Sequence, residues 1–398
     1  MWLQAPAFSL NALSARSFML GTLAAFVGVA SSFAVVLQGL TAAGATTEQA
    51  ASGLMALSLS MGLCAIVLSI RSRLPISVAW STPGAALLAS TTFDGGFGVA
   101  VGAFIVCALL LMASGLLPWL GRAVSRIPVS LASAMLAGIL FTLCLAPARA
   151  IAETPLHGLL LLVAWAVGGM VHRLLAIPAA LAVFVVITLT GSDLSAWSSA
   201  EFEWLPIEWV SPVFTWQGMI GIALPLFIVT TASQNIPGIA VLKSCGYTPA
   251  AGPLFATTGL FSLLSAPFGG HAVNLAAITA ALCAGEEAHA NPQRRYWASI
   301  INGLWYVLFG IAAGAVTLFV SLAPTQLLES VAGLALIGSF AAAAVAAFTP
   351  PQSREAAAVT FFITASGLSF GGISGAFWGL IAGVLIHGMT VWRHERAD

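Results

Sequence analysis

Long apolar runs, separated by short stretches that hold charges, glycine or proline, follow one another along the whole chain. In lipid every backbone polar group needs an internal partner, so such runs are expected to form helices. Only 7% of the 398 residues are charged, and the mean hydropathy is +1.02. Soluble globular domains carry about 25% charged residues. The sequence therefore predicts an all-α polytopic membrane protein in a lipid bilayer.

We expect fourteen transmembrane segments, seven on each side of a polar stretch at 191–212 that holds Asp193, Glu201, Glu203 and Glu208. The segments lie near 17–40, 51–70, 75–91, 97–119, 127–146, 156–172, 176–190, 214–242, 251–266, 267–285, 296–320, 325–347, 356–368 and 373–391. The first run is interpreted as a span rather than a signal peptide, because no small-residue cleavage site follows it.

The basic residues predict the orientation, since lysine and arginine collect on the cytoplasmic side. With the N-terminus inside and fourteen crossings, 12 of the 13 basic residues fall inside, and only Arg149 falls outside. Both termini are therefore expected in the cytoplasm. An odd number of crossings in each half makes the halves inverted repeats, which is typical of transporters.

The stretch Pro267 to Gly285, PFGGHAVNLAAITAALCAG, has the composition of a broken helix. Two glycines weaken the helix at its start. We expect Asn274 to be the N-cap of a half-helix over Leu275 to Cys283.

A second stretch, PISVAWSTPGAALLAS at 75–90, repeats this pattern, with Ser81 or Thr82 as the cap and Pro83 at the first helical position. Aligning the prolines that open the two stretches places Thr82 on Asn274. Each half-helix N-terminus carries about half a positive charge. The two N-termini are expected to face each other near the midplane and to favour an anion.

His271 is the ionisable side chain expected nearest the midplane, and it could carry a proton or, alternatively, be a neutral packing residue. Gln234 and Asn235 lie in TTASQNIPG, where Pro237 is expected to disrupt the helix. These two amides could donate to a carboxylate or only join helices.

The same two interpretations, substrate contact or helix packing, apply to Ser31, Ser32 and Gln38 in the first span. Trp80 and Phe268 flank the two breaks and could stack on an aromatic ring or only pack.

Several classes of site are not indicated. The five cysteines are scattered without a CxxC pair, and no metal-ligand cluster, cofactor loop or enzyme nucleophile motif occurs. No basic patch with interleaved aromatic residues indicates nucleic-acid binding. Glycines 371, 375, 379 and 383 form a close-packing stripe. We favour an internal helix contact for this stripe, with a homodimer contact as the alternative.

The stretches PISVAWSTPGAALL, PLFIVTTASQNIPG and PFGGHAVNLAAITAA resemble the benzoate:proton symporter (BenE) family. More distantly, the chain is similar to uracil/xanthine permeases and to sulfate and bicarbonate anion transporters. The resemblance implies a core domain of 1–125 and 212–322, a gate domain of 126–211 and 323–398, and short strands before the half-helices of segments 3 and 10. In the nucleobase permeases, glutamates occupy what look like the positions of Gln234 and His271, so the difference here argues against a nucleobase.

The resemblance implies import of benzoate, or a related aromatic carboxylate, with a proton across the inner membrane. We expect its carboxylate to bind between Thr82–Gly84 and Asn274–Leu275, near Gln234, with His271 coupling the proton. Two alternatives remain open: a transporter of the same fold for another anion, and an anion channel.

Overall fold

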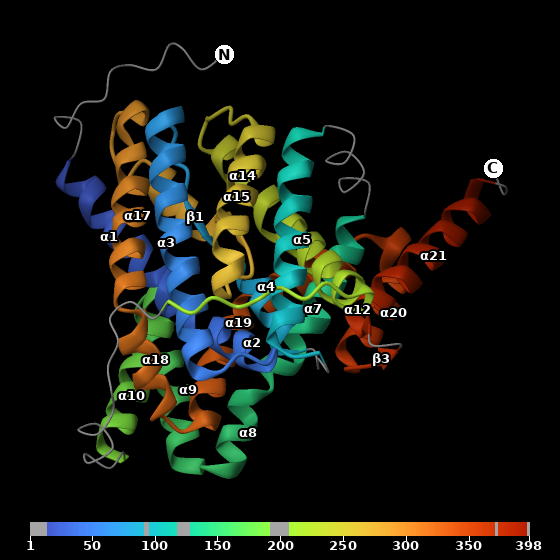
Figure 1. Ribbon diagram of the computed structural model, residues 1–398, viewed down its shortest axis with the longest axis horizontal. Coiled ribbons are helices and arrows are strands. Elements are labelled where there is room, and N and C mark those ends of the chain that lie inside the picture. The colour runs from blue at the N-terminus through green and yellow to red at the C-terminus, as the bar shows by residue number, and fades with distance from the viewer. Residues whose placement is uncertain (1–13, 91–94, 118–127, 192–206, 371–372, 396–398) are drawn as a thin grey trace.

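The computed structural model describes residues 14–90, 95–117, 128–191, 207–370 and 373–395, and helices dominate them (Figure 1). The helices are α1 (Ala15–Ala30), α2 (Phe33–Ala42), α3 (Thr47–Ser72), α4 (Thr82–Ala89), α5 (Phe97–Leu116), α7 (Val129–Cys144), α8 (Ala146–Glu153), α9 (Pro155–Val171), α10 (Ala176–Gly191), α12 (Trp216–Gly218), α13 (Leu224–Thr230), α14 (Ile236–Ser244), α15 (Ala251–Ser265), α16 (Ala277–Ala284), α17 (Tyr296–Ile311), α18 (Ala313–Ser321), α19 (Thr325–Phe348), α20 (Arg354–Ala365) and α21 (Gly375–Glu395).

Four short strands and several turns of tighter or wider helix complete the described part. The strands are β1 (Val78–Trp80), β2 (Val273–Leu275), β3 (Ser369–Phe370) and β4 (Ile373–Ser374). The 3-10 turns are η2 (Arg173–Leu175), η5 (Ala266–Phe268), η6 (Pro292–Arg294) and η7 (Pro351–Ser353), and the π-helical stretches are η3 (Met219–Ala223) and η4 (Thr231–Asn235).

The prediction of a helical polytopic membrane protein is confirmed. Within the described residues, 8 helices are long and apolar enough to cross a membrane, or 9 if a pair bent by 56° between α17 and α18 forms one span. Helices α4 and α16 have 8 residues each, about 12 Å, so neither can cross alone. The expected total of fourteen spans and the inverted repeat stay predictions.

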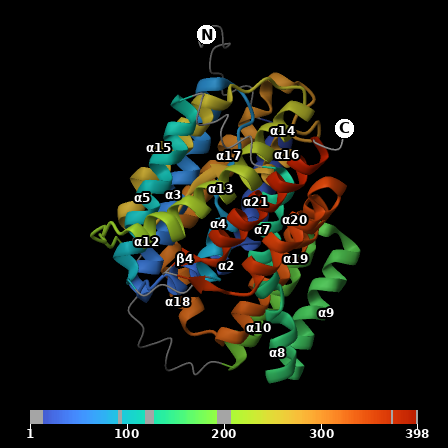
Figure 2. The same cartoon turned by 90° about the vertical axis from the view of Figure 1, so that its right-hand side faces the viewer.

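Most long helices pack in pairs that come from distant parts of the chain. Helix α3 packs along α17, α5 along α15, and α7 along α19. Both views place α8, α9, α10 and α18 at one end of the molecule and α14 and α15 at the other (Figures 1 and 2). Helix α4 lies between these ends in both views, whereas Figure 2 places α16 near α14.

Two expected spans have irregular backbones. The first is interrupted at Ser31–Ser32, between α1 and α2. In the eighth, Pro237 does not break the helix as predicted: the helix widens into η4 before it and continues as α14. A π-helical stretch accommodates the proline because it shifts the backbone hydrogen bonds by one residue.

The glycine stripe of the last segment makes an internal contact, as favoured from the sequence. A Cβ atom at Gly379 would lie 2.6 Å from Oγ1 of Thr364 and 2.7 Å from the carbonyl of Thr360, so α20 approaches α21 too closely for a side chain here. Gly371 of the stripe and Asp193, Glu201 and Glu203 of the polar stretch lie outside the described residues.

Candidate functional site

The strands β1 and β2 pair antiparallel at the centre of the bundle. Their register is Val78 with Leu275, Ala79 with Asn274 and Trp80 with Val273. Two further backbone hydrogen bonds extend the ladder symmetrically, from Ser81 N to Ala272 O and from Ala276 N to Ser77 O, each 3.0 Å long. Because each strand leads into a half-helix, the N-termini of α4 and α16 lie at opposite ends of this short ribbon.

The ladder corrects the predicted start of the second half-helix. Asn274 does not cap a helix: it lies within β2, and α16 begins at Ala277 with Ala276 as its N-cap residue. The symmetry of the ladder makes Ser81, and not Thr82, the counterpart of the second N-cap position. Asn274 was misplaced because pairing with a strand 190 or more residues away overrode its local capping preference.

The first half-helix is capped as predicted. Ser81 Oγ accepts the Gly84 N–H at 3.1 Å. The helix begins at Thr82, so Pro83 takes its second position and not the predicted first. The Ser81 hydroxyl also shares a hydrogen bond of 2.7 Å with Thr230 Oγ1 on α13. Thr82 is half-buried beside it. Sequence reasoning missed Thr230, although it precedes the TASQN run directly.

The second half-helix has no side-chain cap. Its first backbone N–H groups, at residues 277–279, therefore keep the unpaired hydrogens of a helix N-terminus. Ile278, in this first turn, is 64% exposed. The N-terminus of α16 thus presents free donors and a partial positive charge next to an exposed side chain.

His271 lies two residues before β2 and is fully buried. Its Nε2 atom is 2.9 Å from the carbonyl oxygen of Ser81. A carbonyl oxygen only accepts, so Nε2 carries the hydrogen and Nδ1 holds the free lone pair. Nδ1 is buried without a hydrogen-bond partner. The ring lies edge-on to Phe104, with ring centroids 6.2 Å apart.

The amides of the candidate site have mixed pairing. Asn235 Oδ1 accepts the Leu275 N–H at 2.9 Å, and Asn274 Nδ2 donates to the Leu275 carbonyl at 2.8 Å. The other polar atom of each amide, Asn235 Nδ2 and Asn274 Oδ1, is buried without a partner. Gln234 is half-buried one residue before Asn235. Two orphan polar atoms beside a helix N-terminus are expected of a site that binds a polar ligand.

Three more of the predicted residues, Trp80, Ser31 and Ser32, form hydrogen bonds within the protein. Trp80 Nε1 donates to Ser32 Oγ at 2.8 Å, and this links β1 to the interruption of the first span. Ser31 Oγ donates only to the Gly28 carbonyl, at 3.1 Å.

Gln38 lies in α2, with its Oε1 atom buried and unpaired. Phe268 lies edge-on to Trp209, with ring centroids 5.6 Å apart, and its stacking on a substrate ring stays a prediction.

A polar cluster behind α16 was not predicted. Thr279, Asn302 and Tyr306 are buried, and four of their polar atoms have no hydrogen-bond partner. Asn302 and Tyr306 are spaced one turn apart on α17, so polar residues at that spacing in an apolar helix were the available signal.

The described ranges contain no group of three or more His, Cys, Asp or Glu side chains that could hold a metal ion.

The chain is similar to known membrane transport proteins over nearly all of its length. The family model described as benzoate membrane transport protein (BenE) matches residues 11–389. The inner membrane protein YdcO of Escherichia coli (strain K12) is 40% identical over 368 residues, which cover 92% of this chain and 94% of that protein. A benzoate membrane transport protein of Acinetobacter baylyi is 33% identical over 367 residues, covering 92% of this chain and 93% of the relative.

Solved structures with a similar fold are anion transporters. The transmembrane domain of the cyanobacterial bicarbonate transporter BicA aligns with a TM-score of 0.62 and 14% identity, over 96% of this chain and 98% of that one. The murine solute carrier 26 family member A9 anion transporter, in its inward-facing state, aligns with a TM-score of 0.65 and 14% identity, over 99% of this chain and 70% of that one. At these identities the likeness concerns the fold.

Proposed function

The chain belongs to the BenE family of benzoate membrane transport proteins, and we propose that it imports benzoate or a closely related aromatic carboxylate with a proton. Membership makes it a membrane transporter and not an enzyme. The substrate, the proton coupling, the inner-membrane location with both termini in the cytoplasm, and the residues that carry transport are the proposal.

The observation that carries the proposal is the uncapped N-terminus of α16, which lies across a three-residue ribbon from the N-terminus of α4. At about 3.3 Å per residue, the ribbon separates the two N-termini by roughly 10 Å. Converging helix N-termini bind anions through backbone N–H groups. A carboxylate at residues 276–279 would also lie near Asn235 Nδ2, the free amide donor.

The composition around this site supports an anionic substrate. The segments 15–42, 75–90, 214–244 and 267–285 contain no aspartate or glutamate. A substrate that brings its own negative charge therefore meets no like charge from these segments. Its aromatic ring needs an apolar wall, and Trp80 and Phe104, both buried beside the ribbon, are the side chains we assign to it.

Proton coupling follows from the cost of moving an anion inward. Against an inside-negative potential this costs about 2.3 kcal/mol per 100 mV for each charge, and one co-transported proton cancels the cost. We assign the proton to Nδ1 of His271, because Nε2 already donates to Ser81. The bound carboxylate and the imidazolium stabilise each other, so each raises the affinity for the other.

We also propose the fourteen-span inverted repeat, with a core of 1–125 and 212–322 and a gate of 126–211 and 323–398. The packing pattern supports it. If segments 1–7 are exchanged with 8–14, the pair α3 and α17 becomes α15 and α5, and both pairs occur. The pair β1 and β2 maps onto itself. Movement of the core against the gate would then alternate access to the ribbon.

Uptake of labelled benzoate into proteoliposomes tests the proposal, with the pH gradient and the membrane potential imposed separately. We expect saturable accumulation driven by an inward proton gradient and competed by unlabelled aromatic acids. Saturable exchange that ignores the gradient would remove the proton from the mechanism. Competition by inorganic anions alone would indicate another substrate, and flux without saturation would indicate a channel.

A further inference from the structure

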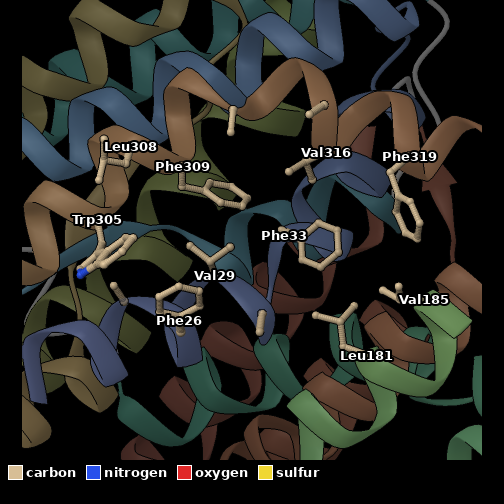
Figure 3. Close-up of a pocket in the computed structure, with 14 residues that line it drawn as sticks. Phe26, Val29, Phe33, Leu181, Val185, Trp305, Leu308, Phe309, Val316 and Phe319 are labelled. Atoms are coloured by element: carbon tan, nitrogen blue, oxygen red, sulfur yellow. The ribbon is translucent and has the colours of Figure 1, made fainter. Parts of the chain in front are cut away.

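An apolar cavity lies next to Trp80 of β1. It has a volume of about 530 Å³ and is lined by residues of α1, α2, α10, α17 and α18 (Figure 3). Phe309 in its wall lies edge-on to Trp80, with ring centroids 6.2 Å apart. Phe26, Phe33 and Phe319 supply other parts of the wall (Figure 3). None of the residues assigned to the substrate lines it.

Two interruptions of the backbone open this cavity. The helix of the first span is interrupted at Ser31–Ser32, between α1 and α2, and α17 and α18 are bent by 56° at Ala312. Straight helices would pack side by side here. The small side chains of Ala25, Ala30 and Ala315 line the space and leave it unfilled.

The chemistry of the lining excludes the transported anion. Every lining side chain is apolar except for the indole N–H of Trp305, and that group already donates to Thr22 Oγ1 at 2.8 Å. A carboxylate would therefore find no donor, and burying it unpaired is strongly unfavourable. Water is equally disfavoured, because apolar cavities stay dry. A flexible hydrocarbon fits this lining.

The cavity is continuous with an apolar surface that faces outward. On α1, Met19 and Phe26 are 68% and 59% exposed and lie on one face, seven residues apart. On α17, Leu304 and Leu308 are exposed in the same way, one turn apart. In a membrane-spanning helix such a face contacts lipid tails. Phe26 and Leu308 belong both to this surface and to the cavity lining.

We propose that the cavity is a binding site for one acyl chain of a membrane lipid. The chain enters sideways from the bilayer past Phe26 and Leu308 and fills the space against Phe309. Resting on the domain assignment of the proposed function, the site lies at a seam, because α10 belongs to the gate and α1, α17 and α18 to the core. The bound chain would then be squeezed or released when the two domains move.

The test uses the full-length protein in detergent, titrated with a phospholipid that carries bromine atoms in mid-chain, a contact quencher of indole fluorescence. The difference in emission between the unsubstituted protein and Trp305→Phe is the contribution of Trp305, which reports binding in the cavity. We expect this contribution to fall as lipid is added and to saturate near one lipid per chain. Quenching that stays linear in lipid, or that is the same in Trp305→Phe, would overturn the proposal.

Filling the cavity supplies the matched control. Ala315→Phe places a ring in the cavity, and we expect it to weaken the saturable quenching at least tenfold. Ala342→Phe adds the same ring at an exposed position on α19 and should leave quenching unchanged. Circular dichroism and gel filtration show whether both variants fold, and Ala30→Leu repeats the test with a smaller group. Unchanged quenching in a folded Ala315→Phe would contradict the site. Because the readout is binding, it stays informative even if benzoate uptake fails.

Discussion

The two units, β1 with α4 and β2 with α16, occupy equivalent places in the ribbon, but their helix N-termini differ in capping. At the first, Ser81 caps α4, Pro83 removes one N–H group, and α4 packs against α7. At the second, Ala276 offers no cap, and α16 packs against α1, α14 and α17. The first N-terminus is therefore largely satisfied within the protein, whereas the second has no side-chain cap.

This difference indicates that the two units of the ribbon have different roles. The capped unit packs against α2 of the proposed core and against α7 of the proposed gate. The uncapped unit carries His271 and includes the exposed Ile278, so we propose that the ligand binds at this unit. The predictions below test whether the two units differ as these contacts indicate.

The largest expected effect comes from Ala276→Asp. Ala276 has φ −106° and ψ 130°, the extended conformation of an N-cap residue. A carboxylate there caps α16 and occupies the place of the substrate's own carboxylate. We expect benzoate affinity to fall roughly 100-fold, since like charges at one site cost several kcal/mol, and this can be measured by equilibrium binding.

Ser81→Asp is the matched control for that change, because it places the same charge at the equivalent, already capped position. We expect a clearly smaller loss of affinity there. Equal losses of affinity in the two variants would contradict different roles for the two units. Ala276→Ser adds a cap without a charge, so it separates these two effects.

The second prediction concerns His271→Gln, which keeps a side-chain donor but cannot be protonated. We expect the stimulation of uptake by an inward proton gradient to fall by about 5- to 150-fold, the usual range for coupling between two ligands. Exchange of benzoate without a gradient should persist. Full gradient-driven uptake in this variant would mean that His271 does not carry the proton.

The third prediction concerns Asn235, which joins β2 to the eighth span through the Leu275 N–H. Asn235→Leu leaves this buried N–H without its acceptor, and we expect a loss of about 1–3 kcal/mol in the free energy of unfolding. Thermal unfolding in detergent measures it. Asn235→Asp keeps an acceptor oxygen, so it should be more stable than the leucine variant yet bind the anion less well. The reverse order of stability would exclude the assigned hydrogen bond.

The smallest expected effect comes from Trp80→Phe, which removes the hydrogen bond to Ser32 and keeps an aromatic ring beside the ribbon. We expect a loss of about 0.5–1.5 kcal/mol of stability and little change in benzoate affinity. Trp305→Phe, which removes the bond to Thr22, is the control for loss of an indole N–H. An affinity loss as large as that of Ala276→Asp would show that binding needs the indole itself and not only an aromatic ring at this position.

Much of this architecture could be read from local sequence. The prolines and glycines of the two broken segments predicted short helices, and Ser81 and Pro83 predicted how the first one begins. The position of Asn274 could not be read locally, because the strand that pairs with it comes from the other half of the chain. The same holds for the Asn235 contact with the Leu275 N–H and for Thr230 beside Ser81.

The cavity beside Trp80 shows a second limit of prediction from the sequence. Its lining comes from five helices, and its volume depends on the bend at Ala312 and the break at Ser31–Ser32. Alanine-rich apolar helices have the same sequence pattern whether or not neighbouring helices pack closely against them. Periodicity therefore predicts which residues face other helices or lipid, but not where two backbones separate.

The antiparallel ribbon also constrains how the chain is made. Ser81 and His271 meet across it although 190 residues separate them in the sequence. Ribosomes add about 5–20 residues per second, so the first strand waits roughly 10–40 s for its partner. Throughout that interval its edge lies unpaired among newly inserted helices. Insertion machinery or water must shield it, and a pause in translation between the two halves would lengthen this exposure.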